Sequence, residues 1–185
     1  MAEIEKLLTD YLNYIEIEKN RSPKTRENYE RYLREFLRFA AISRPEEITD
    51  GLVRNFRMNL ARREIKKITQ GYYVIALRNF LKYLAKRDIR TLAAEKVEVP
   101  KAPSRQIELL DYGDLERLLQ APKGQSLRDF RDRAILELLF STGLRVSELC
   151  ALDRYLDLKR GELSVRGKGD KLRVVFLSDR ARRAI

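Results

Sequence analysis

Apolar residues recur every three to four positions through most of the first ninety residues of this 185-residue chain. This spacing places one apolar stripe along each helix, so it predicts amphipathic helices. Ser22 followed by Pro23 marks one helix start, and Thr49 or Asp50 marks another. Because only short loops join the stripes, we expect a compact four-helix bundle over residues 1–90. The four stripes lie within residues 3–18, 23–40, 52–60 and 69–86.

The helical period is lost over residues 91–106, which contain two prolines. We interpret this segment as a linker, because proline and irregular spacing both disfavour a helix. Residues 107–185 then form a second unit. Asp111 is expected to cap a short helix there, and Gly143 is expected to end a longer helix over residues 126–142.

The period changes from 3.6 to 2 in residues 162–166 and 172–177, which flank a turn containing two glycines. Alternation on both sides of such a turn predicts a β-hairpin. Ser178 is expected to cap a final basic helix. The fold class predicted from these patterns is mainly α, with a single hairpin in the second unit. We also expect apolar side chains on residues 126–142 and on the strands to be left uncovered.

Basic residues outnumber acidic ones, 39 to 28, and the net charge of +11 favours a polyanionic partner. A surface rich in ion pairs is the alternative. One cysteine and no histidine exclude a disulfide framework and make a zinc site or a histidine-based triad untenable. We expect Cys150 to be a core residue. No signal peptide or long apolar run is present, and a cytoplasmic location is expected.

Six of the basic residues fall between Arg54 and Lys67, against one acid, Glu64. This density indicates contacts with DNA phosphates, with a solvated helix face as the alternative. Further polar and basic residues at helix starts and in the linker complete the predicted DNA-binding set. The set comprises Lys24, Thr25, Arg26, Arg62, Arg63, Lys66, Lys67, Thr69, Gln70, Arg78 and Arg105.

Arg145 stands among apolar residues in the stretch STGLRVSEL, residues 141–149. A half-buried guanidinium needs an anion, which here is either the carboxylate of Glu148 or a ligand phosphate. A second basic residue, Lys168, lies between glycines at the tip of the predicted hairpin.

The string TGLRVSEL followed by GKGDK, residues 167–171, resembles the start of the catalytic domain of Xer-type tyrosine site-specific recombinases. The first ninety residues resemble the helical, SAM-like core-binding domain of that family, through Ser22, Thr25, Tyr29 and the helix LRNFLKYL. The resemblance implies DNA integration or chromosome segregation by DNA recombination, without a metal or nucleotide cofactor. It implies double-stranded DNA and further recombinase copies, in a tetrameric synaptic complex, as partners.

The resemblance also implies roles for individual residues. Arg145 matches the first catalytic arginine, which holds the scissile phosphate. Glu148 matches an acidic residue that helps to fix the site, with a purely structural ion pair as the alternative. Lys168 matches the lysine that protonates the departing 5′-oxygen. The flanking glycines let the loop approach the DNA backbone.

The family's remaining groups, including the tyrosine nucleophile, have no counterpart in this sequence. We therefore expect a chain truncated within the catalytic domain, which binds DNA but does not cleave it. One alternative is a natural non-catalytic DNA-binding protein that regulates or competes with an intact enzyme. Another is a helical protein-interaction module without DNA affinity.

Overall fold

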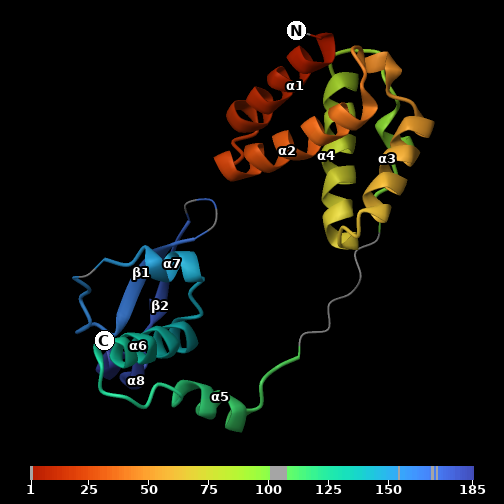
Figure 1. Ribbon diagram of the computed structural model, residues 1–185. Coiled ribbons are helices and arrows are strands. Elements are labelled where there is room, and N and C mark those ends of the chain that lie inside the picture. The colour runs from red at the N-terminus through yellow and green to blue at the C-terminus, as the bar shows by residue number, and fades with distance from the viewer. Residues whose placement is uncertain (1, 101–107, 154, 168, 170) are drawn as a thin grey trace. The chain divides into compact units, whose positions relative to one another are not determined.

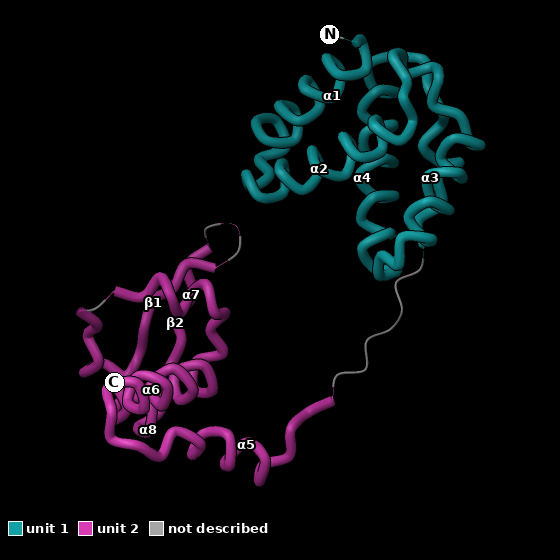
Figure 2. Tube along the Cα trace, in the orientation of Figure 1, with its two compact units in different colours: residues 1–105 teal, residues 106–185 magenta. Residues whose placement is uncertain are grey.

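The computed structural model describes residues 2–100, 108–153, 155–167, 169 and 171–185 (Figure 1). The chain forms two compact units, residues 1–105 and 106–185 (Figure 2). The described residues are mostly helical and contain a single two-stranded sheet, so the predicted fold class is confirmed.

Four α-helices build the first unit, as the four apolar stripes predicted. The Ser22 hydroxyl accepts a hydrogen bond from the backbone N–H of Thr25, which caps the second helix behind Pro23. Thr49, rather than Asp50, caps the third helix. The helices are α1 (Glu3–Asn13), α2 (Pro23–Ala40), α3 (Asp50–Arg62) and α4 (Lys67–Ala85), with shorter turns η1 (Tyr14–Glu18), η2 (Pro45–Glu47) and η3 (Ala94–Lys96).

Helix α4 is the centre of this unit, since it contacts α1, α2, α3 and η3. Its side chains Leu77, Phe80 and Leu84 are at most 1% exposed. Aromatic residues from neighbouring helices fill the core beside it, including Phe36 and Phe56, whose ring centroids are 5.2 Å apart. The apolar stripes therefore meet in one core, as a four-helix bundle requires.

Part of the segment expected to be a linker lies against the first unit. Ala94 and Val97 are 3% and 2% exposed and belong to its core. The Thr91 hydroxyl donates a hydrogen bond of 3.0 Å to the carbonyl of Pro45. Two buried apolar side chains are enough to hold an irregular segment that has no helical period.

The second unit packs helices against the predicted hairpin. Its strands pair antiparallel, with Leu163 opposite Val175 and Val165 opposite Arg173. Helix α6 begins at a Ser126–Asp129 capping box and ends at Gly143, whose φ of 62° suits glycine. The elements are α5 (Tyr112–Leu119), α6 (Leu127–Thr142), α7 (Val146–Cys150), β1 (Glu162–Arg166), β2 (Leu172–Phe176) and α8 (Asp179–Ala184).

Three residues of this unit, Phe130, Val146 and Cys150, are exposed, and one of them, Cys150, was expected to lie in the core. Val146 and Cys150 lie four residues apart in α7, hence on one helix face, and that face points outward. Phe130, in the first turn of α6, is 48% exposed because the core contacts begin farther along the helix, at Leu138. The prediction that Cys150 is a core residue was therefore wrong.

Apolar surface is uncovered in this unit, as expected. Leu172, Val174 and Phe176 occupy the outer face of β2 and are 53–69% exposed, and Phe140 of α6 is 53% exposed. Among the described residues, no helix is both long and apolar enough to cross a bilayer.

Candidate functional site

Arg145 occupies the turn between α6 and α7. Gly143 ends α6, the buried Leu144 anchors the turn, and Arg145 is the N-cap of α7 with extended backbone. Its side chain is 63% exposed. The expectation of a half-buried arginine was wrong, because the residue caps the start of α7 and its side chain points away from the core.

Glu148 holds this arginine at two points. One carboxylate oxygen accepts the backbone N–H of Arg145 at 2.8 Å, and the other accepts Nη1–H of its guanidinium at 2.9 Å. The first contact satisfies an orphan amide at the helix start, and the second orients the side chain. Nε and Nη2 of Arg145 have no partner among the described residues, so their N–H groups are open to an external anion.

Arg173 of β2 completes the cluster. Its Nη1 and Nη2 donate to the two oxygens of Glu148 at 3.0 and 2.8 Å, a bidentate pair. The Glu148 side chain is only 8% exposed. These hydrogen bonds, first from Arg173 and then from the Arg145 backbone, lower the pKa of Glu148 to about 2. The carboxylate is therefore ionised at neutral pH and carries a fixed negative charge between two arginines.

The sequence analysis missed Arg173, although a signal was present. Residues of one strand alternate between faces, and Arg173 is in phase with the buried Val175 and Leu177. A charged residue on the inward face of a strand needs a buried partner, and that partner is Glu148.

Gly167 lies directly against this ion pair. A Cβ atom at this position would come within 2.9 Å of Arg173 Nη1 and 3.6 Å of Glu148 Oε1. Its N–H donates a 2.8 Å hydrogen bond to the carbonyl of Lys171, closing the hairpin. The close approach of Arg173 and Glu148 therefore explains why position 167 is a glycine. Lys168, the predicted general acid, lies outside the described residues.

The three predicted residues at the start of α2 differ in how far their side chains already have partners. Arg26 pairs with Glu16 at 2.9 Å and Glu30 at 3.2 Å. Lys24 pairs with Glu27 in an exposed contact of 2.7 Å, which water and salt screen readily. The Thr25 hydroxyl contacts that of Ser22. Arg26 is thus the least available of the three for a phosphate.

The turn between α3 and α4 carries three exposed cations that are not paired with carboxylates in the described structure. Arg62, Lys66 and Lys67 are exposed, and none forms an ion pair within the described part of the chain. Arg63 instead pairs with Glu35 of α2. Gln70 uses its amide to donate to the carbonyl of Ile65 at 2.6 Å, which shapes the turn.

The six basic residues between Arg54 and Lys67 do not form one surface. Arg63, the C-cap residue directly after α3, lines a hollow with Glu35 of α2. Arg54 and Arg57 line a groove that includes neither Arg63 nor any residue of α2. Positions six residues apart, such as Arg57 and Arg63, point about 120° apart around a helix, which explains the separation. Arg78 of α4 is half-buried, with Nε lacking a partner among the described residues, and Arg105 lies outside them.

A polar and aromatic face lies where α2 and α4 meet, and it was not singled out from the sequence. Arg31 donates to the side chains of Asn28 at 3.1 Å and Tyr32 at 3.2 Å. Tyr32 stacks with Tyr72 of α4, which is 47% exposed. We call Asn28, Arg31, Tyr32 and Tyr72 the α2–α4 face. An exposed guanidinium beside an amide and aromatic rings is a combination that nucleic-acid interfaces use.

Comparisons with known proteins show what this chain is similar to. Residues 8–88 match the family model described as phage integrase, N-terminal SAM-like domain, and residues 108–185 match that of the phage integrase family. The chain is 35% identical over 187 residues to tyrosine recombinase XerC of Thermodesulfovibrio yellowstonii, covering all of this chain and 62% of that protein. It is 34% identical over 178 residues to XerC of Escherichia coli (strain K12 / DH10B), covering 94% of this chain and 59% of that protein.

Solved structures share the fold at lower identity. The Tn1549 transposon integrase in complex with circular intermediate DNA superposes with a TM-score of 0.72 and 19% identity, covering 96% of this chain and 62% of that one. A lambda integrase dimer bound to a COC′ core site superposes with a TM-score of 0.69 and 20% identity, covering 95% of this chain and 62% of that one. The chain spans about three fifths of the length of the curated relatives above.

Proposed function

This chain belongs to the phage integrase family of tyrosine recombinases, and from that premise we propose that it binds the double-stranded DNA of a recombination site. The observation that carries the proposal is the exposed Arg145 guanidinium, held by a nearly buried carboxylate that is itself clamped by Arg173. Site-specific recombination is the proposed activity of the longer protein to which these residues contribute.

DNA is proposed to lie against the first unit at the α3–α4 turn and the α2–α4 face. Arg62, Lys66 and Lys67 have no carboxylate partners in the described structure, so binding phosphates breaks no ion pair. Each phosphate they neutralise releases condensed counterions, which gives sequence-independent affinity. Asn28 and Arg31 present donors that suit base edges or phosphates.

The second unit is proposed to hold the scissile phosphodiester on Arg145. A guanidinium with two open N–H directions contacts two phosphate oxygens and stabilises the charge that grows in a pentacoordinate transition state. Glu148 prevents the side chain from collapsing elsewhere, and Arg173 keeps Glu148 in place and ionised. Lys168 is proposed to protonate the departing 5′-oxygen, by its match to the family lysine.

On its own this chain is proposed to bind without cleaving, because none of its nine tyrosines matches the family nucleophile. Cleavage through a 3′-phosphotyrosine, assembly of four copies around two DNA sites and a cytoplasmic location belong to the same proposal for the longer protein. A non-catalytic regulator at recombination sites would show the same binding without cleavage.

Fluorescence anisotropy of a labelled random-sequence duplex, titrated at several salt concentrations, tests the proposal. We expect micromolar binding with a steep salt dependence. Arg145→Gln is expected to weaken binding about tenfold by removing a charge-assisted contact. The matched control Arg160→Gln, also an exposed arginine of the second unit, should leave the affinity within about twofold. Equal effects of the two variants, or no binding at low salt, would refute the proposed site.

A further inference from the structure

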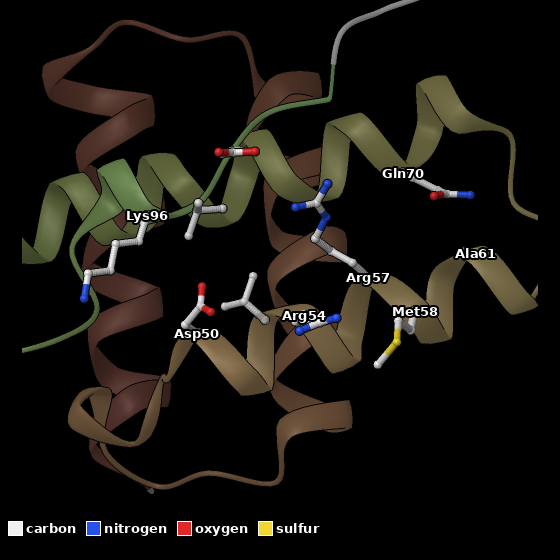
Figure 3. Close-up of a pocket in the computed structure, with 10 residues that line it drawn as sticks. Asp50, Arg54, Arg57, Met58, Ala61, Gln70 and Lys96 are labelled. Atoms are coloured by element: carbon white, nitrogen blue, oxygen red, sulfur yellow. The ribbon is translucent and has the colours of Figure 1, made fainter.

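A groove of about 590 Å³ opens in the first unit between α3, the start of α4 and residues 96–98. It is separate from the α3–α4 turn cations, since Arg62, Lys66 and Lys67 do not line it. Figure 3 shows Arg54 and Arg57 extending from α3 along this groove, with Lys96 on the segment that forms the other wall. All of its lining residues belong to a single unit.

The basic side chains of this groove have no ion-pair partners among the described residues. Arg54, Arg57 and Lys96 form no ion pair or hydrogen bond through their side chains among the described residues. Arg57 is also half-buried, so its guanidinium has lost part of its hydration without gaining a partner. Arg26, Arg34 and Arg63 of the same unit, in contrast, pair with carboxylates. Two unpaired guanidiniums one turn apart therefore indicate a site for an external anion.

The floor of the groove is apolar. Val53 and Val97, which are 4% and 2% exposed, lie beneath it, and Met58 is 43% exposed at its edge. Methionine side chains adapt to varied apolar partners, which makes them common at protein-binding surfaces. A ligand that covers Met58 must itself present an apolar group.

Two carboxylates, Asp50 and Glu98, also line the groove without pairing with its cations. They would repel the evenly spaced phosphates of a nucleic-acid backbone, which in addition has no apolar side chains to place over Met58. A peptide can instead direct one carboxylate to the arginines and an apolar side chain to the floor. The apolar floor and the exposed Met58 therefore favour a protein segment over a nucleic-acid backbone.

We propose that this groove docks an acidic peptide segment of a partner protein, with an Asp or Glu carboxylate on Arg54 and Arg57 and a neighbouring apolar side chain over Met58. This interaction goes beyond DNA binding and uses a different surface of the same unit. Arg62, Lys66 and Lys67 do not line the groove, so the proposal leaves these three cations free for DNA while the partner is bound.

A fluorescein-labelled ten-residue peptide that alternates glutamate and leucine tests the proposal by anisotropy on the full chain. We expect saturable binding with a Kd of about 100 μM or tighter. A peptide with glutamine in place of glutamate should bind at least about tenfold more weakly, since it cannot form charge-assisted hydrogen bonds. Equal binding of the two peptides, or none at millimolar chain concentration, would overturn the proposal.

Two charge-matched variants locate the site. Arg54→Gln with Arg57→Gln should weaken the acidic peptide at least about tenfold, while Arg62→Gln with Lys66→Gln, which removes the same charge, should leave it within about twofold. Asp50→Asn with Glu98→Gln should tighten it about threefold by removing repulsion. Circular dichroism on each variant controls for folding.

Two other occupants would contradict the proposal. If duplex DNA displaces the peptide and the Arg54/Arg57 variant lowers the salt dependence of DNA binding, the groove is a phosphate site. If sedimentation shows a dimer that the Arg54/Arg57 variant dissociates, the groove joins two copies of the chain. Peptide binding by a monomer in the presence of saturating DNA would support the assignment.

Discussion

Removal of two cations from the α3–α4 turn gives the most direct test of where DNA binds. Arg62 and Lys66 are exposed and have no ion pairs within the described residues, so Arg62→Gln with Lys66→Gln removes charge without breaking an internal contact. If each cation neutralises one phosphate, the slope of log K against log salt falls by about 1.8. With equal affinity extrapolated to 1 M salt, the variant binds about 200-fold more weakly at 50 mM and about 20-fold more weakly at 200 mM.

The assay is anisotropy of a labelled random-sequence duplex at five salt concentrations between 50 and 300 mM. The matched control is Arg54→Gln with Arg57→Gln, which removes the same charge from the groove rather than from the turn. The turn variant should lose slope, whereas the groove variant should keep the parental slope. An unchanged slope for the turn variant would show that these cations do not contact DNA. Equal losses for both variants would mean that only total charge matters, and would refute the proposed surface.

Three other outcomes are expected. Because the pKa of Glu148 is lowered, its ionised form stabilises the second unit above about pH 4.5, and this stabilisation is lost as the pH falls toward 2. The melting temperature followed by circular dichroism should therefore fall over that pH range. The fall should be smaller for Glu148→Gln. Gly167→Ala should lower both the melting temperature of the second unit and the DNA affinity, because a Cβ would press on Arg173. The control Gly71→Ala adds a Cβ that meets nothing within 4 Å, and it should stabilise α4 by about 0.5–1 kcal/mol. Incubation with a nicked duplex should give no denaturation-resistant adduct, and a covalent complex seen on a denaturing gel would show that one of the nine tyrosines is a nucleophile.

The local structure could be predicted from the sequence because its signals are themselves local. The apolar period, the Ser22–Pro23 start and the Gly143 stop each depend on neighbours within one or two helical turns, and all were confirmed. The hairpin followed from alternation on both sides of a glycine-containing turn. The error at Cys150 has the opposite origin, because periodicity identifies a helix face but does not say how much of a short helix the core reaches.

In the candidate site, too, some contacts could be predicted from the sequence and others could not. Arg145 and Glu148 lie three residues apart, so their contact follows from helix geometry alone. The run of basic residues, in contrast, looked continuous along the chain. Helix α3 turns Arg54 and Arg57 toward one groove and Arg63 toward Glu35, which separates a single linear cluster into surfaces with different neighbours.

The sequence by itself determined the helices, the hairpin, the excess of positive charge and the family, because these depend on composition and on short-range spacing. Only the tertiary structure decided that Glu148 is clamped by Arg173, twenty-five residues away, and that Gly167 lies against the pair. It also decided which cations have carboxylate partners and which do not. An ion pair forms only where folding brings two charges within about 4 Å, and that distance depends on packing between elements rather than on their order in the chain.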